Sequence, residues 1–280
     1  MAQENNIEEK HTIKANLKVF FPIIFELLRE SNIDWNTVQE LFTNKFNQYK
    51  ERQSRFVEPI QIEASIYSVI SGAIKNDREA ILLYSFLKKL FEELADNLNE
   101  NEKCLIKDTI FGVLTNVDNK YLNFVGELMV LNHFKKRMPL DLIDVEVPLN
   151  LNNPKGKKID FKFLDKQANI VYFIEVVNIR LDKINTANEQ NIERLLSQKL
   201  KEKILKKGKS DHFKYYLIPV LWGQWDEIKA VTNYYIKSKF QIDDMSVPIC
   251  FIPFTDADDK IVHRTGSIDT MFENTTVTVK

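Results

Sequence analysis

Two acidic residues in neighbouring predicted strands are the best candidates for chemistry in this sequence. Asp160 lies in a run where apolar and polar residues alternate, which is typical of a half-buried strand. Glu175 interrupts an otherwise apolar, β-prone run over residues 170–177. An acid inside a buried strand costs on the order of several kcal/mol unless it is paired, hydrogen-bonded or bound to a cation. Binding of a divalent cation by both carboxylates is the sharpest of these hypotheses.

A further glutamate and three lysines fall on faces that point toward these acids. A predicted helix before the two strands carries Glu127 in its apolar stripe, and a predicted helix after them carries Lys199 and Lys203 within its apolar arc. Lys162 shares a strand face with Asp160, because side chains alternate along a strand. Each has an ordinary alternative role: a core glutamate is commonly paired, and lysines in an apolar arc commonly extend to its edge.

The order of these residues along the chain resembles the PD-(D/E)XK nuclease superfamily, the restriction-endonuclease-like fold. The resemblance covers residues 119–222 and consists of a helix with an inward glutamate, a strand with aspartate, a strand with glutamate, a lysine-bearing helix and a strand. The usual motif is Pro-Asp on one strand and Asp/Glu-X-Lys on the next. Here Ile159-Asp160 corresponds to the first part and Glu175-Val176-Val177 to the second, so that valine stands at the position of the motif lysine.

The resemblance implies a metal-dependent endonuclease that hydrolyses phosphodiester bonds. Such a reaction needs a divalent cation to activate water and to neutralise charge on the phosphorus centre. The ion would be Mg²⁺ or Mn²⁺, and Mg²⁺ prefers carboxylate and carbonyl oxygens. The implied ligands are the carboxylates of Asp160, Glu175 and Glu127 and the backbone carbonyl of Val176.

The resemblance also implies a lysine that orients the attacking water and stabilises negative charge in the transition state. In some members of the superfamily this lysine comes from the neighbouring helix, where a side chain can fill the gap left by Val177. Lys199 is the first candidate because it lies nearer the helix start, Lys203 is the second, and Lys162 on the strand is the third.

The elements that must position these residues divide the chain into two predicted domains. Residues 1–117 read as a helical domain, with helices at about 17–29, 34–55, 58–75, 77–95 and 102–114. Residues 118–280 read as a mixed sheet flanked by helices and extended by a C-terminal strand. Its predicted elements are a helix at 121–136, strands at 144–148, 157–165 and 170–177, a helix at 190–207, a strand at 213–221, a helix at 225–240 and a strand at 247–254. The predicted fold class is α+β or α/β.

Charge along the chain indicates where a partner would bind. The net charge is −1, yet residues 119–214 contain 19 Lys and Arg against 12 Asp and Glu, a balance of +7 around the candidate site. This favours nucleic acid as the partner, although a solvated basic helix face is the plainer explanation. Of the two nucleic acids, we expect DNA before RNA. No segment resembles a signal peptide or a membrane span, so we expect a soluble, cytoplasmic protein. The N-terminal helices are candidates for contact with a protein partner or a second copy of the chain.

Two other functions remain open at the level of sequence. The valine in place of the motif lysine is compatible with a degenerate nuclease-like domain that binds nucleic acid or protein without cleaving. The large N-terminal helical region is compatible with an interaction protein whose α/β part is structural.

Overall fold

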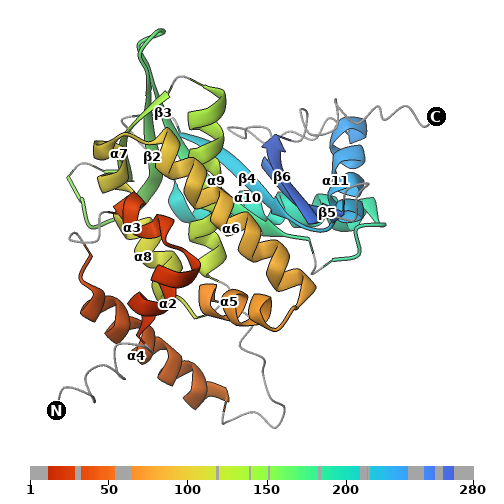
Figure 1. Cartoon of the computed structure of the whole chain (residues 1–280). Coiled ribbons are helices and arrows are strands. Elements are labelled where there is room, and N and C mark those ends of the chain that lie inside the picture. Colours follow the sequence, from red (N-terminus) through yellow and green to blue (C-terminus); the bar gives the residue numbers. More distant parts are fainter. Residues whose placement is uncertain are drawn as a thin grey trace, which may run out of the picture. The chain divides into compact units, whose positions relative to one another are not determined.

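The computed structural model of the protein describes residues 12–28, 33–53, 65–117, 120–138, 140–150, 152–181, 184–208, 213, 215–238, 249–255 and 261–267. The chain forms two compact units, Met1–Leu128 and Met129–Lys280 (Figure 1). The division lies inside helix α9 (Tyr121–Arg137), later than the predicted boundary after residue 117. The start of α9 packs closely in the first unit, since a Cβ on Gly112 would lie 2.5 Å from the Phe124 ring. The fold class is α+β, as predicted.

The described part of the first unit is helical. Its helices before α9 are α2 (Ile13–Phe20), α3 (Ile23–Leu28), α4 (Trp35–Gln53), α5 (Ile66–Ile74), α6 (Arg78–Asn97), α7 (Glu100–Leu105) and α8 (Lys107–Thr115). Two of these helices begin with an aspartate N-cap: the Asp34 carboxylate accepts hydrogen bonds from the Asn36 and Thr37 N–H groups, and the Asp77 carboxylate accepts one from the Ala80 N–H. Such bonds satisfy N–H groups that have no partner within the helix.

Two of the predicted N-terminal helices are each divided in the structure. The segment predicted as 17–29 forms α2 and α3, because Pro22 disfavours helical backbone at Phe21, whose φ is −132°. The segment predicted as 102–114 forms α7 and α8, which meet at Ile106. The predicted helix start at 58 lies outside the described residues.

The second unit contains a mixed six-stranded sheet in the order β1-β2-β3-β4-β5-β6. The strands are β1 (Leu140–Pro148), β2 (Lys158–Asp165), β3 (Ile170–Arg180), β4 (Tyr215–Trp222), β5 (Ile249–Thr255) and β6 (Ile261–Ser267). β1, β2 and β3 are joined antiparallel, β3, β4 and β5 are parallel, and β6 is antiparallel to β5. The predicted mixed sheet is therefore confirmed, whereas β6 was not predicted.

Helices cover both faces of this sheet. On one face the second half of α9 contacts β2, where the rings of Phe134 and Phe163 lie 5.4 Å apart. On the other face α10 (Glu189–Lys207) and α11 (Trp225–Ser238) share an apolar core with odd-numbered residues of β3 and β4, including Val177 and Leu217. Because strand side chains alternate, Glu175 points to the same face as Val177, toward α10.

Candidate metal site at the parting of two strands

Asp160 and Glu175 lie opposite each other where β2 and β3 separate. The β2–β3 ladder ends at the pair Phe161 and Ile174, and the next residues in register are the two acids. Beyond that point β2 continues along β1 and β3 continues along β4. The structure thus brings the two acids together on adjacent strands, on the face that α10 covers.

The carboxylate of Asp160 takes the place of a backbone acceptor in this gap. Its Oδ2 accepts a hydrogen bond of 2.6 Å from the Val176 N–H. The N–H and C=O of one strand residue point to the same side, so the Val176 carbonyl is also directed toward β2. The predicted carbonyl ligand therefore faces the gap that Asp160 enters.

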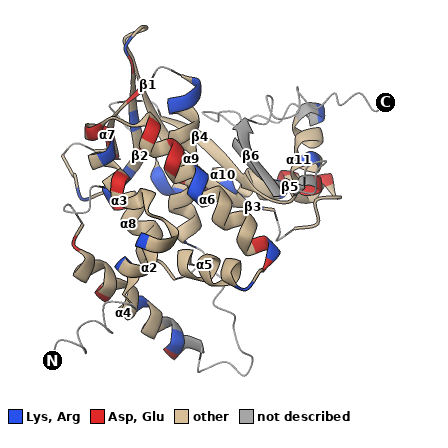
Figure 2. Cartoon of the chain, viewed as in Figure 1, with Lys and Arg blue, Asp and Glu red and all other residues tan. Residues whose placement is uncertain are grey.

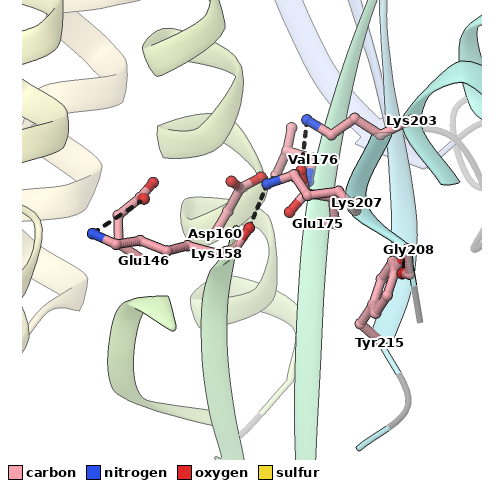
Figure 3. A network of polar contacts seen from close by, with 9 residues as sticks. All are labelled: Glu146, Lys158, Asp160, Glu175, Val176, Lys203, Lys207, Gly208 and Tyr215. Atoms are coloured by element: carbon pink, nitrogen blue, oxygen red, sulfur yellow. Dashed lines mark hydrogen bonds and ion pairs between the residues drawn. The ribbon is translucent and has the colours of Figure 1, made fainter. Parts of the chain in front are cut away.

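Glu175 is completely buried, at 0% exposure, and is held by two lysines of α10. Its Oε1 lies 2.6 Å from the Lys203 ammonium and 2.8 Å from the Lys207 ammonium (Figure 3). Both contacts are ion pairs without good hydrogen-bond angles, and Oε2 has no hydrogen-bond donor among the described residues. A buried carboxylate oxygen without a donor is costly, which makes Oε2 a place for a ligand to bind.

The ionisation of Asp160 is strongly perturbed by this environment. Burial, and then the neighbouring charge of Glu175, raise the pKa of Asp160 from 3.8 to about 7. The charge of Lys203, the Val176 N–H and the charge of Lys207 act in the opposite direction and only partly offset this rise in pKa. Two neighbouring buried carboxylates repel each other when both are ionised, which favours protonation of one of them.

Lys199 is not the lysine that reaches the acids, although the sequence favoured it. Its side chain is exposed, and the inward positions belong to Lys203 and Lys207. Glu175 lies in the middle of β3, and a helix rises about 1.5 Å per residue against about 3.3 Å per residue for a strand. Because α10 follows β3 and runs back along it, the helix reaches the level of Glu175 only in its last two turns.

The other strand candidate, Lys162, is directed to an aromatic ring. Its ammonium lies 5.9 Å from the centroid of the Phe173 ring, the residue opposite it on β3. This places Lys162 on the same sheet face as Asp160, as expected, with a cation–π partner further along the hairpin.

Lys207 was missed by sequence reasoning. The apolar arc of the helix ends at Ile204, and the next apolar residue, Leu205, is exposed, so the last turn does not reveal its inward side. The available signal was spacing, because Lys207 follows Lys203 by four residues and side chains four apart share a helix face.

Glu127 is half-buried on α9 and belongs to the first compact unit, whereas Asp160 and Glu175 belong to the second. Its role as a third carboxylate ligand stays a prediction. Within the described ranges, no three His, Cys, Asp or Glu residues are grouped so that they could hold a metal ion. The candidate site contains only two side chains of these types, Asp160 and Glu175, together with a backbone carbonyl, so it is smaller than a group of three.

Comparison of the chain with protein-family models, with curated proteins and with solved structures finds no match. Among the described helices, none combines the length and apolar character needed to cross a membrane.

Proposed function

We propose that this protein is a divalent-cation-dependent nuclease that hydrolyses phosphodiester bonds, with DNA as the first substrate to test. The observation that carries the proposal is the pair of buried carboxylates at the parting of β2 and β3, with lysines of α10 on one of them. The elements α9, β2, β3, α10 and β4 follow one another in the order that resemblance to the PD-(D/E)XK superfamily implies, with β1 as an additional strand between α9 and β2.

The residues at the gap fit a hard divalent cation. Glu175 offers a buried Oε2 without a donor, Asp160 stands opposite it, and the Val176 carbonyl is directed to the same place. Oxygen donors of this kind suit Mg²⁺ and Mn²⁺. When bound, such an ion supplies Lewis-acid activation of water and neutralises charge on the phosphate.

Lys203 is the best candidate for the lysine that Val177 replaces. Val177 is buried in the apolar core beneath α10, and α10 supplies the two lysines that contact Glu175. The Lys203 ammonium contacts Oε1 of Glu175. Of the two lysines, its charge also lowers the pKa of Asp160 more. An ammonium group beside both acids can stabilise the charge that develops on a scissile phosphate.

The test is a cleavage assay on single- and double-stranded DNA and RNA with Mg²⁺ or Mn²⁺. Replacement of Asp160 by Asn or Glu175 by Gln should abolish cleavage, and Lys203→Met should lower it by about two orders of magnitude. Lys199→Met is the matched control, since this exposed lysine lies on the same helix. Absence of cleavage by the wild-type protein on all four substrates would reject the proposal.

One observation favours a second candidate, a domain that binds nucleic acid without cleaving it. Two ammonium groups already contact Glu175, so its buried charge is compensated without a metal ion. Nucleic-acid binding that needs no divalent cation and yields no cleavage product would support this alternative.

A further inference from the structure

Lys207 contacts both strands at the point where they part. Its ammonium donates a hydrogen bond to the backbone carbonyl of Lys158 on β2 and lies 2.8 Å from Oε1 of Glu175 on β3 (Figure 3). The side chain of Lys207 is 17% exposed, compared with 27% for Lys203. One cation therefore links two strands that no longer share backbone hydrogen bonds.

The end of α10 holds Lys207 in this position. The next residue, Gly208, ends the helix with φ +82°, and its N–H donates to the Ile204 carbonyl at 2.7 Å. The carbonyl of Gly208 accepts a hydrogen bond of 2.7 Å from the Tyr215 hydroxyl at the start of β4. A positive side chain is also favoured at the carboxyl end of a helix by the helix dipole. Lys207 is thus fixed through its backbone as well as through its ammonium group.

We propose that Lys207 is a positioning residue that serves as a built-in counter-ion, competing with a divalent cation for Glu175. The inference rests on the cation site of the proposed function and adds how that site is controlled. Without a divalent cation, Lys207 compensates the buried Glu175 charge and holds β2 to β3. When a divalent cation binds, the two positive charges repel, so the affinity of the site is lower than the two carboxylates alone would give.

Lys203 and Lys207 accordingly have different tasks. Lys203 has the larger electrostatic effect on Asp160, and its ammonium lies 2.6 Å from Oε1 of Glu175. Lys207 instead connects Glu175 to the backbone of β2. Removal of Lys207 should strengthen cation binding, whereas removal of Lys203 should chiefly affect the chemical step.

The experiment is a titration of the full chain with Mn²⁺, without nucleic acid, followed by calorimetry and by electron paramagnetic resonance. Lys207→Met should bind Mn²⁺ at least about fivefold more tightly than the wild type, because one competing charge has been removed. Its melting temperature should be lower without Mn²⁺ and should rise more steeply when Mn²⁺ is added, since a ligand stabilises the state that it binds. Lys206→Met is the matched control, because Lys206 is exposed on the same turn.

A charge-preserving variant and a refolding measurement test the counter-ion role of Lys207 further. Lys207→Arg, which keeps the positive charge that repels the divalent cation, should bind Mn²⁺ like the wild type. If Lys207→Met is unfolded without Mn²⁺, its helical circular dichroism signal should return when Mn²⁺ is added, and no return would overturn the inference. Equal or weaker Mn²⁺ binding by Lys207→Met, or no binding by either protein, would also overturn it.

These results are separable from failure of the proposed hydrolysis. Cleavage by the wild type together with unchanged Mn²⁺ affinity in Lys207→Met rejects the counter-ion role alone. Tighter Mn²⁺ binding in Lys207→Met without cleavage by any form of the protein supports the counter-ion role and rejects the hydrolysis.

Discussion

At the scale of single residues, Asp160 combines two tasks that conflict when no cation is bound. It must accept the Val176 N–H, and it lies beside a second buried acid. The hydrogen bond favours the ionised carboxylate, whereas burial and the charge of Glu175 favour the protonated form and prevail. The perturbed pKa is typical of functional sites, where such conflicts are retained for chemistry.

This conflict predicts how stability depends on pH in the absence of divalent cations. The pKa of Asp160 is about 7 in the folded protein and 3.8 is its ordinary value, so folding favours the protonated form. The stabilisation that this provides is fully present below about pH 4 and is lost as pH rises to about 7. Asp160→Asn keeps an acceptor and removes the charge. At pH 8 it should therefore be more stable than the wild type by on the order of 1 to 4 kcal/mol.

Urea unfolding at pH 4, 6 and 8 in the presence of a chelator measures this difference. The advantage of Asp160→Asn should grow with pH and be smallest at pH 4. Asp165→Asn is a suitable control, because Asp165 lies at the other end of the same strand. An advantage of Asp160→Asn that does not change with pH would contradict the assignment of the raised pKa.

Sequence could predict the two acids because strand alternation is a two-residue repeat that fixes which side chains share a face. It could not choose the lysine in the same way. A helical wheel gives the angle of Lys199 or Lys203 around the helix axis but not its level along the strand below. That level depends on the length of the connection before α10 and on the position of Glu175 within β3.

At the scale of elements, the site depends on where α10 ends. Gly208 has φ +82° and ψ −173°, a region of backbone conformation that only glycine adopts readily. A Cβ at this position would meet no atom within 4 Å, so any effect of a side chain there comes from the backbone alone. The helix end that carries Lys207 is therefore set by one glycine.

Substitution Gly208→Ala should destabilise the protein by about 1 to 3 kcal/mol, because the backbone must be strained or must change conformation. A change of conformation would also move Lys207 away from Glu175. Urea unfolding gives the stability, and Mn²⁺ affinity should then approach that of Lys207→Met. If Gly208→Ala unfolds like the wild type, the helix end does not require this conformation.

Elements were predictable where hydrophobic periodicity was long and the caps were polar. α6 after Asp77 and α10 after Asn188 meet both conditions. The break between α2 and α3 was missed because proline is tolerated near the start of a helix, which is where Pro22 lies in the predicted segment 17–29. The structure instead places Pro22 after the end of α2, where the next helix has its own start.

At the scale of the whole molecule, basic residues occur on several elements (Figure 2), and α10 carries more of them than acidic residues. Its basic residues are Arg194, Lys199, Lys201, Lys203, Lys206 and Lys207. Lys203 and Lys207 are occupied with Glu175, whereas Lys201 and Lys206 are exposed. The exposed lysines are the ones available to the phosphates of a nucleic acid.

If α10 contributes to a nucleic-acid surface, affinity should fall steeply as salt rises, because each neutralised phosphate releases counterions. Reversal of Lys201 and Lys206 to Glu should weaken binding and reduce the salt dependence by about one unit of slope per contact. Lys88 and Lys89, which are exposed on α6, provide a matched double reversal as the control. Fluorescence anisotropy at several salt concentrations measures both effects. An affinity that changes neither with salt nor with either double reversal would indicate a protein partner.

The hydrogen bond from the Val176 N–H to Asp160 has an evolutionary consequence. Here a side chain completes a sheet, so the residue proposed for chemistry is also required by the fold. If the proposed hydrolysis is correct, a lineage that lost it would be free to lose the negative charge at this position but not the acceptor. Asparagine is then the natural replacement, and its appearance among descendants would record the loss of activity while the architecture was inherited intact.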